Sequence, residues 1–128
     1  MTEPRWLRHD IVIAIHEAQL DEHGGASGVR DAGMLLSALD RPKNTFHYEQ
    51  ADVIACAAAY AYGLAQNHAF VDGNKRTALL ACLLFLGLNG FKITAQESQI
   101  LVAVIKLSAG EWSENEFEIW LRDSVQST

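Results

Sequence analysis

The fold of this chain is decided by residues 50–88, QADVIACAAAYAYGLAQNHAFVDGNKRTALLACLLFLGL. Two apolar segments, about Gln50–Gln66 and Asn74–Leu88, flank the short polar stretch Asn67–Gly73. Each apolar segment is long enough for a helix, and the second is apolar on all sides, which is typical of a buried central helix. Asn89-Gly90 then favours a left-handed helix end. We therefore expect two adjacent helices at the centre of an all-α domain.

The rest of the sequence predicts four further helices around this pair. They span about Asp10–Glu22 with Asp10 as N-cap, Asp31–Leu39 ended by Arg41-Pro42, Gln96–Ser108, and Ser113–Asp123 with a capping box of Ser113 and Glu116. Alternation of Phe46 and Tyr48 with polar residues predicts a short extended flap over Lys43–Glu49, and Phe91–Ile93 is a candidate short strand. The expected architecture is a compact bundle of about six helices in a single domain, 1–128.

Composition narrows the classes of function. The chain has 128 residues, of which 49% are hydrophobic and 20% charged, so it can bury a core and is not disordered. Its net charge of −6 disfavours binding to the phosphate backbone of a nucleic acid. A local basic cluster can still hold one small phosphate ligand.

The sequence also predicts a soluble, cytoplasmic protein with no membrane partner. Residues Met1–Trp6 lack the apolar region of a signal peptide, and the longest apolar stretches are shorter than the ~18 residues that span a bilayer. Cys56 and Cys82 lie among alanines and leucines, which is typical of reduced thiols in a core.

The polar stretch between the two central helices carries the candidate chemistry. Gly73 and Asn74 stand at a helix start, where unpaired backbone N–H groups attract an anion, and Lys75 and Arg76 add two positive charges beside them. Such a cluster predicts a phosphate-binding turn.

Two further residues of the stretch complete a candidate site. Asp72 can hold Mg²⁺, which binds through one or two carboxylates together with substrate phosphates. His68 is the group here that can take a proton near neutral pH. Together with the basic turn, these residues predict a Mg²⁺–nucleotide site with a base facing an incoming hydroxyl.

A purely structural interpretation stays open on spacing alone. Asp72 and Asn74 can cap a helix, while Lys75 and Arg76 are merely solvated. A Walker A loop is excluded because Asn74 separates Gly73 from Lys75 and a helix precedes them. Zinc is disfavoured because no third ligand is near in sequence. The histidines spaced by seven, His9, His16 and His23, are interpreted as structural.

Residues 68–76, HAFVDGNKR, closely resemble the signature loop of the Fic/Doc family, His-x-Phe-x-Asp/Glu-Gly-Asn-Gly/Lys-Arg. Agreement with the Doc branch extends along the chain, at Ile15-His16, Gly24-Gly25, Gly28–Asp31, Leu39, Pro42, Tyr48, Thr77–Leu79, Leu84–Leu86 and Asn89-Gly90. The resemblance implies a Fic-like fold and the toxin of a toxin–antitoxin pair.

Two departures from the broader family bear on the reaction. AMP-transferring members carry Gly where this chain has Lys75, and a further Arg where it has Leu79. The resemblance to Doc implies instead a protein kinase that transfers the γ-phosphate of ATP to a Ser/Thr hydroxyl of a translation factor, elongation factor Tu, and so arrests translation. The alternatives are an AMP-transferase and an inactive antitoxin-binding module.

Residue roles follow from the same resemblance. His68 is implied as general base, Asp72 as the Mg²⁺ ligand, and Gly73 and Asn74 as the nucleotide-binding turn. Lys75 and Arg76 are implied both to bind the nucleotide and to neutralise phosphate charge during transfer. Phe70 is expected to anchor the loop in the core. The Lys43–Glu49 flap is expected to align the target peptide.

The resemblance also implies control by another chain. Self-restraining relatives carry Ser/Thr-x-x-x-Glu-Gly/Asn, whereas the one Glu-Asn pair here is Glu114-Asn115, with Gly110 at the Ser/Thr position. We therefore expect inhibition in trans by an antitoxin protein.

Overall fold

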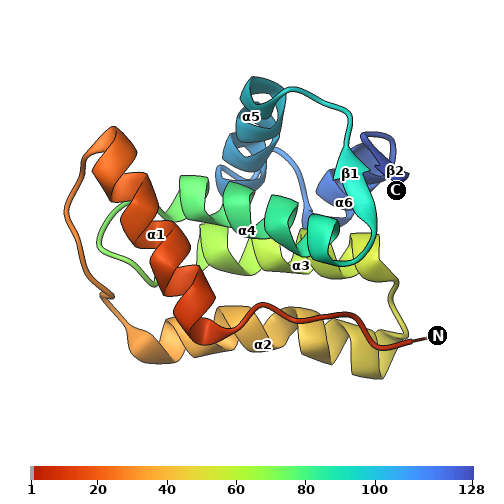
Figure 1. The fold of residues 1–128 in the computed structure, drawn as a ribbon, viewed down its shortest axis with the longest axis horizontal. Helices are drawn as coiled ribbons and strands as arrows, with labels where there is room; N and C mark the ends of the chain where they lie inside the picture. The colour runs from red at the N-terminus through yellow and green to blue at the C-terminus, as the bar shows by residue number, and fades with distance from the viewer. Residues whose placement is uncertain (1) are drawn as a thin grey trace.

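The computed structural model describes residues 2–128, and these form six helices and a two-stranded sheet (Figure 1). The elements are α1 (His9–His23), α2 (Ala32–Glu49), α3 (Val53–Gln66), α4 (Asn74–Leu88), β1 (Phe91–Ile93), α5 (Glu97–Ser108), α6 (Glu114–Arg122) and β2 (Val125–Ser127). The predicted all-α class is confirmed.

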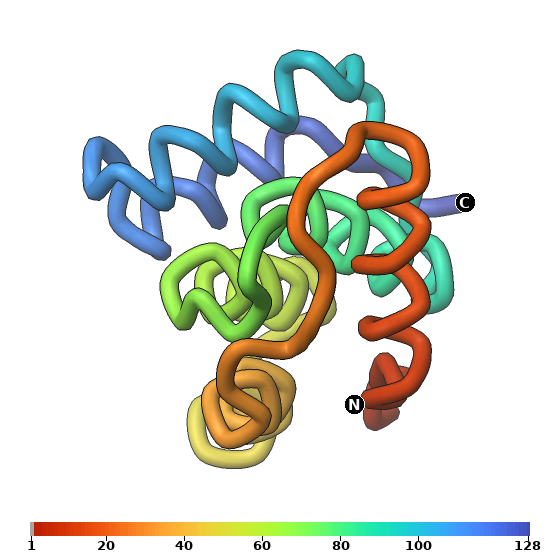
Figure 2. The backbone as a smooth tube through the Cα atoms, turned by 90° about the vertical axis from the view of Figure 1, so that its left-hand side faces the viewer, coloured from red at the N-terminus to blue at the C-terminus, as the bar shows by residue number. Residues whose placement is uncertain are grey.

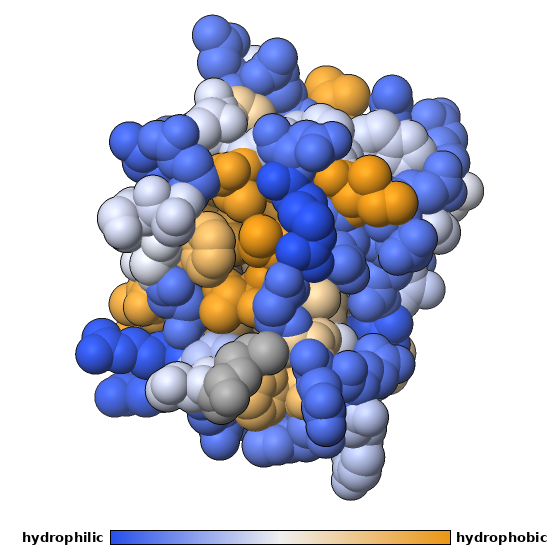
Figure 3. Space-filling view, turned by 90° about the vertical axis from the view of Figure 1, so that its right-hand side faces the viewer, coloured by the Kyte–Doolittle hydropathy of each residue, from blue (hydrophilic) through white to orange (hydrophobic). Residues whose placement is uncertain are grey.

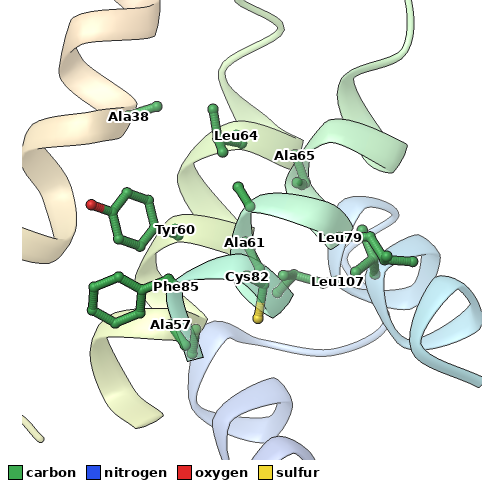
Figure 4. Packing of buried hydrophobic residues seen from close by; sticks show 14 of the residues in the cluster. Ala38, Ala57, Tyr60, Ala61, Leu64, Ala65, Leu79, Cys82, Phe85 and Leu107 are labelled. Atoms are coloured by element: carbon green, nitrogen blue, oxygen red, sulfur yellow. The ribbon is translucent and has the colours of Figure 1, made fainter. Parts of the chain in front are cut away.

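Helices α3 and α4 lie side by side at the centre, as their apolar composition predicts. The long helix α2 packs along α3, α1 lies against α4, and α5 and α6 cover the central pair from another side (Figure 1). Figure 4 shows the contact between Tyr60 of α3 and Phe85 of α4, whose ring centroids are 4.8 Å apart. Alanines of α3 allow its neighbours to approach closely on several sides.

Helix α2 is the main correction to the sequence prediction. It does not end at Arg41-Pro42 but continues through Pro42 to Glu49, so the predicted flap over Lys43–Glu49 is helical. The buried positions Leu35, Leu39 and Pro42 recur at helical spacing and continue to Phe46, which packs on the core. Burial of this continuous apolar face outweighs the hydrogen bond that a proline removes from a helix.

Two smaller differences concern the ends of elements. Helix α1 begins at His9 with Arg8 as N-cap, because the carbonyl of Arg8 accepts from Ile11 and Val12; Asp10 lies in the first turn. The predicted strand at Phe91–Ile93 is confirmed, and its antiparallel partner β2 was not expected from the sequence. Three residues are too few for a periodic signal.

Both cysteines are free and buried, as predicted. Burial raises the pKa of the Cys56 thiol to about 12 and that of Cys82 to about 12, so both stay protonated near neutral pH. No helix in the described part of the chain is long and apolar enough to cross a membrane.

The turn after α4 binds the N-terminal segment at Arg5 and the last residue, Thr128. The side chain of Asn89 accepts from the backbone N–H of Arg5 at 2.7 Å and donates to its carbonyl at 3.0 Å, while Thr128 N–H donates to the carbonyl of Gly90 at 2.9 Å. On the side of the molecule where the ends lie, apolar side chains reach the surface among hydrophilic ones (Figure 3).

Candidate functional site

The loop between α3 and α4, residues 67–73, is held by the extended segment between α1 and α2, residues 24–31. Val29 and Phe70 form an antiparallel bridge, and Val71 N–H donates to the carbonyl of Gly28 at 3.1 Å. The N–H groups of Arg30 and Asp31 both donate to the carbonyl of Ala69. Figure 2 shows the two segments crossing beside the start of α4. The extended segment next to the site is therefore 24–31 and not the predicted 43–49.

His68 has a backbone conformation that is rare for a residue other than glycine, with φ of 50°. The Arg30 side chain secures this conformation, because its Nε donates to the carbonyl of His68 at 2.9 Å. The His68 side chain is exposed, and its ring forms no hydrogen bond within the described residues. The imidazole is therefore accessible to a ligand.

Asn74 has a structural task, but it is not the helix cap considered from the sequence, because the N-cap of α4 is Gly73. Its side-chain amide donates to the carbonyl of Phe70 and accepts from the N–H of the same residue, both at 3.0 Å. This pair of hydrogen bonds folds the loop back onto the first turn of α4. The Asn74 side chain is therefore occupied, and its backbone N–H is the group left for an anion.

The N-terminus of α4 presents unpaired donors. Gly73 is the N-cap with φ of 76°, and the first N–H bonded back into the helix belongs to Thr77, at 3.0 Å from the Gly73 carbonyl. Asn74, Lys75 and Arg76 N–H groups have no acceptor among residues 2–128, and no side chain caps the helix. Neither Lys75 nor Arg76 forms an ion pair within the same residues. The turn is equipped to bind an anion.

Asp72 lies beside this turn with an exposed carboxylate. Its Oδ1 accepts from the Gly73 N–H at 2.8 Å, and a Cβ added to Gly25 would lie 2.8 Å from its Oδ2. Glycine at position 25 thus leaves the space that the carboxylate fills. Within the described chain, no group of three or more His, Cys, Asp or Glu residues is placed to hold a metal by protein ligands alone. A single carboxylate suits Mg²⁺ that is shared with substrate phosphates.

A pocket of about 440 Å³ brings all six predicted site residues together, His68, Asp72, Gly73, Asn74, Lys75 and Arg76. His23 and Gly24, from the end of α1, complete its wall with Val71. Periodicity and spacing do not indicate that the end of α1 reaches this loop, because the two segments are far apart in the chain; only the resemblance to the Doc branch at Gly24-Gly25 singled out this end.

Phe70 and His16 form the floor beneath the loop. Phe70 is 1% exposed, as expected of an anchor, and it stacks on the ring of His16 with centroids 3.8 Å apart and planes 10° apart. His16 Nε2 lies 2.7 Å from the carbonyl oxygen of Asp72. The seven-residue spacing predicts a structural role for His9, His16 and His23. Of these three, His16 alone is buried.

Comparison with known proteins agrees with this arrangement. The sequence model of the Fic/DOC family matches residues 6–86, which contain the whole 67–77 segment. This chain belongs to the Fic/DOC family.

Two curated relatives place this Fic/DOC chain in the Doc branch. It is 36% identical over 90 residues to "Protein kinase doc" of Escherichia phage P1, covering 70% of this chain and 71% of that protein. It is 46% identical over 74 residues to "Toxin Doc" of Mycolicibacterium smegmatis, covering 56% of this chain and 57% of that protein.

Proposed function

We propose that this Doc-type protein is a toxin that transfers the γ-phosphate of ATP to a serine or threonine hydroxyl of a translation factor. The observation that carries the proposal is the shared pocket, in which an exposed histidine faces a helix N-terminus with three free N–H groups, two cations and one carboxylate. Phosphoryl transfer depends mainly on positioning and charge neutralisation, which these groups supply.

The mechanism assigns one task to each group. The backbone N–H groups of Asn74, Lys75 and Arg76 bind phosphate oxygens, and the Lys75 and Arg76 side chains neutralise charge that develops during transfer. His68 accepts the proton of the acceptor hydroxyl as its oxygen attacks the γ-phosphorus, and the bond from that phosphorus to the bridging oxygen of ADP breaks.

Asp72 would hold Mg²⁺, and the bound ion would neutralise phosphate charge and orient the nucleotide. The carboxylate is accessible and fixed by the Gly73 N–H, so it is already oriented before a nucleotide arrives. Substitution of Gly25 by a larger residue would displace it, which makes that glycine part of the same arrangement.

Lys75 favours γ-phosphate transfer over the alternative, AMP transfer. A side chain at this position crowds a phosphate that approaches the backbone of the turn, whereas glycine would leave that space free. The name of the phage P1 relative, a protein kinase, supports the same choice.

The partners proposed are elongation factor Tu as substrate and an antitoxin as inhibitor. The "Toxin Doc" relative supports a toxin with a partner antitoxin. Glu114, of the pair Glu114-Asn115, forms an ion pair with Arg41 of α2 and does not line the pocket, which is consistent with inhibition by a separate chain.

The test is transfer of label from radioactive ATP to purified elongation factor Tu in the presence of Mg²⁺. Label should move from [γ-³²P]ATP and not from [α-³²P]ATP, and His68→Ala should reduce the rate at least 100-fold, as expected for a general base. His9→Ala, at an exposed histidine outside the pocket, is the matched control and should leave the rate unchanged.

Two outcomes would overturn the proposal. Transfer from the α-labelled nucleotide would identify an AMP-transferase. An absence of both labels, with tight antitoxin binding and no growth arrest on expression, would identify an inactive binding module.

A further inference from the structure

His16 is a buried polar residue on the face of α1 that packs against the rest of the molecule. It is 1% exposed and shares this face with Val12 and Gln19. Burial of an imidazole destabilises the fold unless its ring nitrogens form hydrogen bonds. The hydrogen-bond partner of His16 therefore indicates its role.

The partner is the backbone of the candidate metal ligand. His16 Nε2 lies 2.7 Å from the carbonyl oxygen of Asp72, and because a carbonyl only accepts, the Nε2 atom carries the hydrogen and donates it. The ring is held in this direction by its stack on Phe70, with planes 10° apart. The hydrogen bond restrains the edge of the imidazole ring, and the stack on Phe70 restrains its face.

Within the described chain, His16 is the hydrogen-bond partner of the Asp72 carbonyl, whereas the preceding loop residues are bonded by other segments. Ala69 is held by Arg30 and Asp31, Phe70 by Asn74, and Val71 by Gly28, whereas the Asp72 carbonyl is held by His16. The next peptide unit begins the left-handed Gly73, whose N–H binds the Asp72 carboxylate.

Gly73 also lies directly against the imidazole. A Cβ at this position would lie 3.6 Å from the Cδ2 and Nε2 atoms of His16 and 3.7 Å from Leu20 of the same helix. Helix α1 therefore forms the support on which the Asp72–Gly73 turn rests.

We propose that His16 is a positioning residue that fixes the Asp72–Gly73 turn, so that the Asp72 carboxylate and the first N–H groups of α4 point into the same pocket. The inference rests on the proposed function for its catalytic consequence. Its structural part stands on the hydrogen bond and the stack alone. Groups that orient a metal ligand in this way typically change metal affinity or activity about 10- to 100-fold when removed.

Two substitutions separate the hydrogen bond from packing. His16→Phe keeps a flat ring against Phe70 but loses the donor, and His16→Gln keeps an N–H donor at a similar reach but loses the ring. His9→Gln, on the same helix and exposed, is the matched control. Each variant is first checked for folding by thermal unfolding.

We expect His16→Phe to lower kcat at least 10-fold and to raise the Mg²⁺ concentration for half-maximal rate, with little change in the KM for the protein substrate. His16→Gln should recover the rate to within about threefold of the wild type. Wild-type kinetics in a folded His16→Phe variant, or a His16→Gln variant that folds but loses as much activity as the Phe variant, would overturn the inference. If the Phe variant does not fold, the Gln variant decides alone.

A second readout does not depend on catalysis. Hydrogen exchange of the Gly73 amide and the affinity for Mg²⁺–ADP should change in His16→Phe, with faster exchange and weaker binding, and should return toward wild type in His16→Gln. Failure of the wild type to phosphorylate any protein, with this pattern intact, would count against the proposed function and not against the positioning role. An unchanged Gly73 amide in folded His16→Phe would refute the positioning role directly.

Discussion

Thr77, in the first turn of α4, has a side-chain hydroxyl that is fully buried and has no hydrogen-bond partner among the described residues. Its backbone N–H is satisfied by Gly73, but its Oγ1 is not bonded to the same carbonyl, as threonine hydroxyls in helices often are. An unpaired buried hydroxyl destabilises a fold by roughly 1–3 kcal/mol.

Thr77→Val should therefore stabilise the protein. Valine keeps the branched shape and removes the unpaired oxygen, so we expect the free energy of unfolding to rise by about 1 kcal/mol, measured by urea denaturation. Thr77→Ser, which keeps the hydroxyl and removes a methyl group, should lower it. A loss of stability in Thr77→Val would show that the hydroxyl has a partner in solution.

At this scale the sequence predicted residues that the structure brings together in one pocket, but it did not predict all of their contacts. The motif from His68 to Arg76 was recognisable because its charges and glycine are contiguous. The support from His16 and Arg30 depends on contacts between distant segments, and the hydrogen bonds of the Asn74 side chain to Phe70 depend on how the local loop folds; periodicity and spacing encode neither.

Among the elements, α2 and α3 approach each other closely at Gly63. A Cβ added to Gly63 would lie 3.2 Å from the Cα and from the carbonyl oxygen of Ala38, so one of the two helices would have to shift. Close approach of helix backbones increases the dispersion contacts between them.

Gly63→Ala tests this approach. Overpacking costs about 1–3 kcal/mol, while alanine gains about 1 kcal/mol in helix propensity, so we expect a net loss of stability of about 1 kcal/mol in thermal or chemical denaturation. Gly87→Ala, in α4 where nothing lies within 4 Å of the added Cβ, is the control and should stabilise by up to about 1 kcal/mol. Equal effects of the two substitutions would mean that α2 is free to move away.

The same helix shows where local sequence rules fail. Arg41-Pro42 predicted an end because proline lacks a backbone donor, yet α2 continues for seven residues beyond Pro42. The apolar spacing through Phe46, which joins the core, is the better guide, and it is visible in the sequence only once Pro42 is counted as a buried position. The central pair α3 and α4 was predicted closely because helices that are apolar on most sides have to lie in the core.

For the whole molecule, an ion pair fastens the last helix to the central pair. Asp52, the N-cap of α3, accepts from Ala55 N–H and from both terminal nitrogens of Arg122 in α6, at 2.7 and 3.1 Å. The Arg122 guanidinium holds the pKa of the Asp52 carboxyl below its usual 3.8. Arg122 also contacts Glu118 of its own helix.

Asp52→Asn should therefore weaken the fold in a pH-dependent way. Because the folded pKa lies below the unfolded one, the ion pair stabilises above about pH 4 and is lost as pH falls through the folded pKa. Asparagine still caps the helix, so near pH 7 we expect a loss of less than about 1 kcal/mol, with the difference from wild type shrinking in acid. Unfolding midpoints at a series of pH values measure this.

Asp40→Asn is the control, since Asp40 is exposed and forms no ion pair in the described chain. Its profile should follow that of the wild type throughout. A difference between Asp52→Asn and wild type that stays constant with pH would mean that the loss of stability does not arise from the charge of Asp52.

The turn at Asn89-Gly90, which holds both Arg5 and Thr128, has a topological consequence. Arg5 of the N-terminal segment and Thr128 are both bound at the end of α4 that is remote from Gly73, about 22 Å along a 15-residue helix. A linker that replaces the residues before Arg5 and joins Arg5 to Thr128 would close a ring, and the ring could be reopened at the exposed Ala109-Gly110 turn between α5 and α6. Such a circular permutant, or a surface-immobilised form tethered at Thr128, would leave the candidate pocket at the start of α4 undisturbed.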